Sequence, residues 1–152
     1  MTTSSNPSQS FVSVPITVVM TDGVAGKSDP HPTYTWTNPG SSHSQTSSTL
    51  DIAGMVNGTV YHLEFTVTNP TWCFVGFFNK TNSNHQPPPG HKGNMGNHQL
   101  ALVDSKTLGS NSMSLVNWCT DTGSYTFSIS LAHLSGPFAV WSYDPTVTNT
   151  SK

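Results

Sequence analysis

The sequence has very few charged side chains. Asp, Glu, Lys and Arg make up 8% of the 152 residues, against about a quarter in an ordinary soluble domain. All five basic residues are lysines, and they are scattered along the chain. A protein that binds nucleic acid presents clustered Lys and Arg to the phosphates. The composition, with a net charge of -2, therefore excludes nucleic acid as an expected partner.

Long apolar runs are also missing. A helix that crosses a bilayer needs about 20 apolar residues, and no segment approaches that length. The first ten residues, MTTSSNPSQS, have neither the basic stretch nor the apolar stretch of a signal peptide. We expect no membrane span, and a protein that is cytoplasmic or secreted by a route without a visible signal peptide.

Cysteine is scarce, with Cys73 and Cys119 each following a tryptophan. A disulfide between them would close a loop of about 46 residues and contribute about 4 kcal/mol on the chain-entropy model. Cysteines inside cytosolic strands are usually buried free thiols. Because no leader sequence is visible, we favour two thiols and keep the disulfide as the alternative.

What the sequence has in abundance is alternation of apolar and polar residues. The segments 11–21, 60–68 and 123–133 alternate with period two, which is typical of strands with one buried face. Turn-forming residues separate these segments. We expect strands near residues 11–21, 32–37, 47–52, 60–68, 73–80, 98–105, 112–120, 123–133 and 137–143.

This pattern predicts an all-β, single-domain antiparallel β-sandwich of eight to nine strands, immunoglobulin-like or jelly-roll in type. The polar ends of the chain lack the alternation. We therefore expect a flexible N-terminal arm at residues 1–10, the sandwich domain at 11–147 and a C-terminal tail at 148–152.

Three short segments resemble a known family. The closing FAVWSYDPTVTN has Asp144-Pro145 followed by the aliphatic Val147 and by Asn149, and PITVVMTDG and FTVTNPTWCFVGF are similar in style. In these segments, at most about a third of the chain, the sequence resembles the small uncharacterised bacterial DP-EP family of β-domains. The resemblance implies a compact β-domain and supplies no catalytic residues.

Catalytic patterns are absent from the sequence. A hydrolytic carboxylate pair needs two acidic side chains facing one cleft, and Glu64 is the only glutamate. Asp22, Asp121 and Asp144 lie in turn contexts, where Asp is favoured for its backbone hydrogen bonds. No Gly-x-Ser-x-Gly pattern occurs. We expect a protein that is not an enzyme and has no cofactor.

Three histidines lie in the long segment HQPPPGHKGNMGNH. His85, His91 and His98 could supply neutral imidazoles to a divalent metal such as zinc. Their six- and seven-residue spacings match no known zinc pattern, and no Cys, Asp or Glu nearby completes a set. A polar loop that serves as an interaction surface is the interpretation we favour, and a metal-binding β-protein is the second alternative.

Tryptophans and amides suggest a different ligand. Trp118 is out of phase with the buried residues of its segment, and Trp36 lies between two turn signals. Together with Asn94 and Asn97, exposed indoles could bind a glycan. A carbohydrate-binding, lectin-like module is therefore the first alternative function.

Low charge also bears on assembly. Charged residues, especially Lys, and Pro are the usual protection of sheet edges against pairing with another chain, and this sequence has few of the charges. Our main prediction is a non-catalytic binding or structural module that self-associates into a homo-oligomer or a larger assembly.

Overall fold

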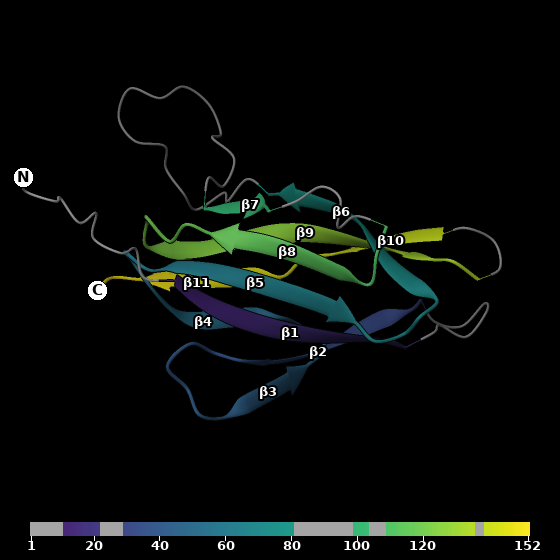
Figure 1. Ribbon diagram of the computed structural model, residues 1–152, viewed down its shortest axis with the longest axis horizontal. Helices are drawn as coiled ribbons and strands as arrows, with labels where there is room; N and C mark the ends of the chain where they lie inside the picture. The colour runs from purple at the N-terminus through teal and green to yellow at the C-terminus, as the bar shows by residue number, and fades with distance from the viewer. Residues whose placement is uncertain (1–10, 22–28, 81–98, 104–108, 136–138) are drawn as a thin grey trace, which may run out of the picture.

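The structure is a computed structural model that describes residues 11–21, 29–80, 99–103, 109–135 and 139–152. These residues form eleven strands (Figure 1). The strands are β1 (Phe11–Thr21), β2 (His31–Thr37), β3 (Ser44–Ser47), β4 (Asp51–Val56), β5 (Val60–Val67), β6 (Trp72–Asn79), β7 (Leu100–Leu102), β8 (Ser112–Asn117), β9 (Gly123–His133), β10 (Ala139–Tyr143) and β11 (Thr146–Thr150). In this part of the chain, no helix is long and apolar enough to cross a membrane.

The strands form two sheets. The first has the order β3-β2-β1-β5-β8-β7. The second is built around β9, which pairs along one side with β6 and along the other with β10 and then β11. Strand β4 completes it by pairing with β11. Figure 1 shows the sheets as two layers, with β1, β5 and β8 in one and β4, β9 and β11 in the other.

Aromatic side chains join the two layers. The ring of Phe65 on β5 contacts the rings of Phe74 on β6 and Phe127 on β9, with centroids 6.2 and 6.3 Å apart in edge-to-face arrangements. All three side chains are buried. Such pairs stabilise a core by about 0.5–1.5 kcal/mol beyond the burial of their area. The alternating residues of the sequence thus form one core between the sheets.

The all-β prediction is confirmed, but the expected number of eight to nine strands is wrong, and the pairing is mainly and not wholly antiparallel. The structure has eleven strands, and both sheets are mixed because β1 pairs parallel to β5 and β4 pairs parallel to β11. A parallel pair needs a long crossover connection. Between β1 and β5 the chain has room for one, because β2, β3 and β4 lie there.

The sequence did not predict strands β3 and β11, because neither has the regular alternation of apolar and polar residues. The segment SQTS forms β3 although it has no apolar residue, and the expected strand at 47–52 is divided between β3 and β4. Strand β11 extends to Thr150, so residues 148–150 belong to the sheet and not to a C-terminal tail. Its second inward position is a polar residue, Asn149, which is 1% exposed. Apolar alternation alone does not reveal such strands.

A network of buried amides explains why Asn149 faces inward. Its Nδ2 donates to Oε1 of Gln99 at 3.2 Å, and its Oδ1 accepts from Nδ2 of Asn117 at 2.8 Å. Gln99 in turn accepts from the backbone N–H groups of Thr120 and Asp121. The three amides connect the end of β8 and the start of β7 in the first sheet with β11 in the second. We call this set, Gln99, Asn117 and Asn149, the amide network.

The outward faces of the strands are rich in hydroxyl groups and nearly free of charge. The pairing register aligns five residues across the first sheet, which we call the hydroxyl row: Thr46, Thr35, Thr17, Thr66 and Ser112. In the second sheet, hydroxyl groups pair between β9 and β10 or β11: Ser124 with Thr148, Thr126 with Thr146 and Ser130 with Ser142. Within the eleven strands, Asp51 and Glu64 are the only Asp, Glu, Lys or Arg residues.

Replacing Asn149 tests the amide network. Asn149→Ala removes three hydrogen bonds from a buried site, to Gln99, to Asn117 and to the backbone carbonyl of Asp121, so we expect the free energy of unfolding to fall by about 2–3 kcal/mol. Thr148→Ala, which removes a hydroxyl from a half-buried, outward-facing position of the same strand, is the control and should change the free energy of unfolding by less than about 0.5 kcal/mol. Urea denaturation followed by circular dichroism measures both. Equal effects of the two substitutions would contradict the network's role.

Candidate functional site

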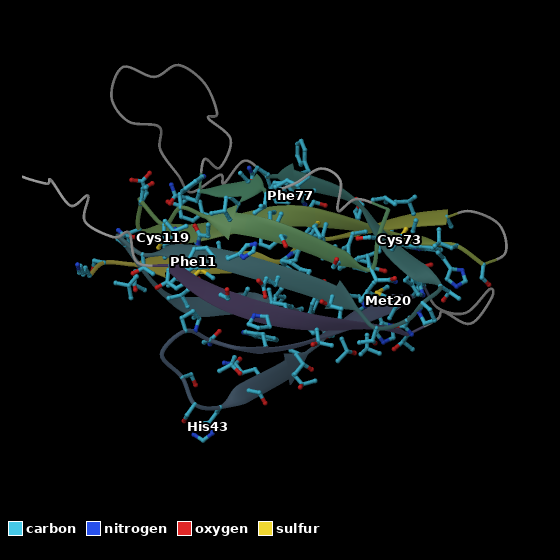
Figure 2. All side chains as sticks on the ribbon, viewed as in Figure 1. Phe11, Met20, His43, Cys73, Phe77 and Cys119 are labelled. Carbon is cyan, nitrogen blue, oxygen red and sulfur yellow. The ribbon has the colours of Figure 1, made fainter. Side chains whose placement is uncertain are left out.

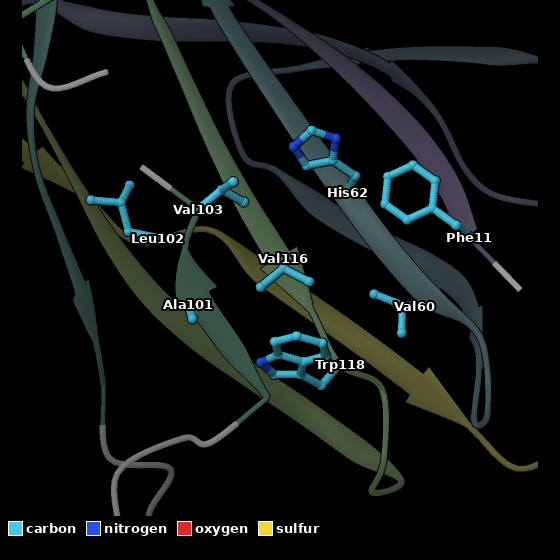
Figure 3. A pocket seen from close by; sticks show the side chains of 8 residues that line it. All are labelled: Phe11, Val60, His62, Ala101, Leu102, Val103, Val116 and Trp118. Carbon is cyan, nitrogen blue, oxygen red and sulfur yellow. The ribbon is translucent and has the colours of Figure 1, made fainter. Parts of the chain in front are cut away.

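A groove of about 550 Å³ lies on the outward face of the first sheet, near the β7 edge (Figure 3). Four strands and the residues that follow two of them contribute its lining. The lining residues are Phe11 of β1, Val60 and His62 of β5, Ala101 and Leu102 of β7, Val103, Val116 of β8, and Trp118. The register explains how they meet, because His62 pairs with Val116 and Val116 pairs with Ala101.

The groove arises from a change of polarity along the outward face. On β8 the outward positions run from Ser112 and Ser114 to Val116, and Trp118 follows at the next outward position. Strand β1 changes in the same direction, from Thr17 to Phe11. Outward positions are therefore hydroxyl-bearing at the level of the hydroxyl row and apolar at the groove.

Several apolar side chains at the groove are exposed. Phe11 is 60% exposed, Val103 52% and Trp118 46%. Single exposed apolar residues are normal on protein surfaces, whereas a contiguous apolar set marks a binding surface. Since these three line one groove, we take it as the candidate functional site.

His62 brings a polar group into this apolar lining. Its Nδ1 lies 3.2 Å from Oε1 of Glu64, two residues further along β5. Its Nε2 is buried and has no hydrogen-bond partner within the part of the chain that the structure describes. A neutral imidazole has one donor and one acceptor nitrogen. In the neutral ring of His62, Nδ1 carries the proton because a carboxylate can only accept, and Nε2 is an acceptor.

This geometry does not assemble a hydrolytic site. A nucleophile and its base must lie within hydrogen-bond reach of each other. Ser13 pairs across from His62 in the register of β1 and β5, yet Nε2 of His62 has no hydrogen-bond partner among the described residues. Over the same residues, no three His, Cys, Asp or Glu side chains form a group that could hold a metal ion.

Trp36, predicted as a ligand-binding residue, lies in the core. It is 4% exposed, and its Nε1 donates to Oδ1 of Asn38 at 2.8 Å. The same Oδ1 accepts from the backbone N–H of Ala53 at 3.1 Å, which ties the turn after β2 to β4. The prediction that Trp36 is an exposed contact residue is wrong, because its phase within β2 points the indole inward and its N–H is satisfied there.

The other predicted residues divide into two groups. Trp118 is exposed and lines the groove, in keeping with its position out of phase with the buried residues of β8. The remaining predicted ligand-binding residues, Asn94 and Asn97, and the predicted metal ligands, His85, His91 and His98, lie outside the described residues. Their roles stay predictions.

Sequence reasoning did not identify Phe11, His62 and the other lining residues as a site. A signal was present, since Phe11, Val60 and Val116 are apolar at positions of the alternation that face outward. What sequence could not supply was the register, which brings these positions together from strands distant in the chain.

The cysteines are free thiols, as predicted. Both are buried, and Figure 2 shows them toward opposite ends of the molecule. Burial raises the pKa of the Cys119 thiol to about 11. Burial also raises the pKa of Cys73, against a smaller lowering by a backbone hydrogen bond at Ala132. Neither thiol has the lowered pKa of a catalytic or redox-active cysteine.

Comparison with known proteins gives a likeness of fold. No family model matches the chain, and no curated protein matches it. Seven chains of known structure do match. One of them is the crystal structure of an inclusion body protein, PixA, from Burkholderia cenocepacia J2315, with a TM-score of 0.50. It is 11% identical, and the match covers 95% of this chain and 99% of that one. At this identity the match shows the fold alone.

The two thiols should be unreactive in the folded protein. The thiolate is the reacting form, and raising the pH from 7 to 9 stays below the pKa of about 11 for Cys119. We expect no reaction with Ellman's reagent over this pH range, and reaction of both thiols after denaturation in guanidinium chloride. Absorbance of the released thionitrobenzoate measures this, and a rapid reaction of the native protein would contradict the burial.

Proposed function

We propose that this protein is a non-catalytic structural module that associates with copies of itself. The observation that carries the proposal is the lack of charge on its strands, where two acidic residues and no basic residue occur. Like charges normally keep neighbouring protein surfaces apart. Outward faces made of Thr and Ser hydroxyls allow copies to approach closely and to exchange hydrogen bonds.

The edges of the first sheet favour the same function. Strand β3 forms one edge, and its residues are Ser44, Gln45, Thr46 and Ser47. The first three are exposed and none is charged. An edge without Lys, Pro or a bulge offers its free backbone N–H and C=O groups to another strand. The shortness of β3 limits this pairing, so we assign the greater part of the contact to the hydroxyl row beside it.

The second sheet has a better protected edge at β4. Ala53 donates its backbone N–H to Asn38 in the turn after β2. A Cβ on Gly54 would lie 2.5 Å from the carbonyl oxygen of Pro39, so the turn lies directly against the strand. Self-association through the first sheet is therefore the arrangement we propose.

The match to an inclusion body protein supports a role in assembly, since PixA bears that description and has the same overall fold. We further propose that the two packed sheets are an open β-sandwich; the immunoglobulin-like and jelly-roll types stay predictions. Membership of the DP-EP family likewise stays a prediction.

The first alternative, a carbohydrate-binding module, rests on the exposed indole of Trp118. Sugar hydroxyls need several hydrogen-bonding partners around such a ring, whereas the groove offers His62 and the indole N–H. Trp118 alone gives this function less support than the uncharged faces give self-association. The metal-binding alternative depends on His85, His91 and His98 and stays a prediction.

Mass in solution tests the proposal. We expect light scattering at low micromolar concentration to give a mass well above the 16.3 kDa of one chain. A mass of one chain throughout that concentration range would refute self-association.

Placing a charge on the hydroxyl row tests the surface. Thr17→Lys introduces a cation at an exposed central position of the row, where a neighbouring copy would carry the same charge. We expect association to weaken by about tenfold, since an unpaired charge in a contact costs on the order of 1–3 kcal/mol. Ser151→Lys, which adds the same charge at an exposed position beyond β11, is the control. If both substitutions weaken association equally, the effect comes from net charge alone and the hydroxyl row is not the contact surface.

A further inference from the structure

We propose that the groove on the outward face of the first sheet is a binding site for a small, neutral, apolar molecule that carries one hydroxyl group or one N–H group. The groove shares β1, β5 and β8 with the hydroxyl row but lies further along these strands, and it has no lining residue in common with the row. The proposal is therefore independent of self-association through the hydroxyl row.

The dimensions suit a small molecule. Ligand sites in proteins are concave, measure about 300–1,000 Å³ and are mostly apolar with a few polar groups. This groove measures about 550 Å³. Valine and alanine side chains of β5, β7 and β8 line it, and the rings of Phe11 and Trp118 stand at its sides (Figure 3). Aromatic rings on two sides favour a flat ring as the ligand.

The unsatisfied Nε2 of His62 defines the polar group of the ligand. Glu64 holds the proton on Nδ1, which leaves Nε2 as an acceptor with no partner among the described residues. In Figure 3 the ring edge turned away from Phe11 carries a nitrogen and faces Val103 across the groove. An unsatisfied buried acceptor costs free energy, and a ligand hydroxyl or N–H that donates to it removes that cost.

Access to Nε2 requires a side chain on the Val103 side of the ring to move, because the ring of Phe11 lies on the other side of His62, with centroids 5.5 Å apart. Val103 is 52% exposed, so its side chain can change rotamer without disturbing the core, and exposed side chains do so within nanoseconds. A small molecule can then reach the recessed nitrogen. The flat hydroxyl row of a second copy would not reach it.

The charge of the lining sets the charge of the ligand. None of the eight lining residues is Asp, Glu, Lys or Arg. An anionic ligand would lose its hydration without gaining a cationic partner, and the carboxylate of Glu64 beside His62 would repel it. A cationic ligand would also lose its hydration, with only the carboxylate of Glu64, outside the lining, to attract it. A neutral molecule avoids both penalties.

A matched pair of probes tests the hydrogen bond. 4-Ethylphenol has a flat ring and one hydroxyl donor, and 4-ethylanisole is its methyl ether without the donor. In ¹⁵N–¹H correlation spectra we expect 4-ethylphenol to shift the amides of Ala101 and Val116, which lie on neighbouring strands of the groove. It should bind about 5- to 10-fold more tightly than 4-ethylanisole, the contribution of one net hydrogen bond.

Variants assign this difference to His62. His62→Phe keeps a ring and removes the acceptor, so the preference for 4-ethylphenol should vanish. Trp118→Ala should weaken both probes about equally. Val19→Ala, at an exposed apolar position of β1 outside the groove, is the control and should change neither affinity. Equal binding of the two probes to the unaltered protein, or an unchanged preference in His62→Phe, would overturn the proposal.

Repeating the titration with Thr17→Lys separates the two proposals. If the groove is a ligand site, this variant binds 4-ethylphenol normally whatever its mass. If 4-ethylphenol instead lowers the mass measured by light scattering, a second copy occupies the groove and the ligand proposal fails.

Discussion

The hydrogen bonds among Gln99, Asn117 and Asn149 hold together the end of the molecule on which the groove depends. Asn117 lies between Val116 and Trp118 in the sequence, and its buried amide fixes the end of β8. The backbone of Gln99 accepts from the N–H of Trp118 at 2.7 Å, which sets the path of the chain after β8 beside β7. Because Asn149 belongs to the second sheet, both layers determine where Trp118 and Ala101 lie.

Much of the fold could be predicted from alternation alone. The long strands at 11–21 and 123–133 have apolar residues at every second position, and the structure confirms both. Strand β3 has no apolar residue, and β11 has a buried asparagine where the pattern would require an apolar side chain. The parallel pairing of β1 with β5 could not be predicted from alternation either. It depends on the path by which the chain comes back to the sheet, and alternation shows only which residues face inward.

The candidate site was predictable only in part. The phase of Trp118 indicated an outward indole, and the structure confirms its exposure. The exposure of Trp36 was predicted from the turn signals on either side of it, whereas the indole is buried on the same face of β2 as Tyr34, with Asn38 two residues further on accepting from its N–H. His62 was not predicted as a site residue, because a histidine on an outward face is usually solvated. Its significance comes from Glu64 and from the apolar neighbours that pairing brings around it.

The proposed self-association depends on the uncharged outward faces of the two sheets. Hydroxyl groups stand there in place of charged side chains, so contacts between copies would be uncharged. The dependence of association on salt tests this account most directly. Sedimentation velocity in about 50 mM and about 500 mM NaCl, a range over which the screening length falls severalfold, should give the same assembled species. An assembly that dissociates at high salt, or a single chain at both salt concentrations, would contradict the account.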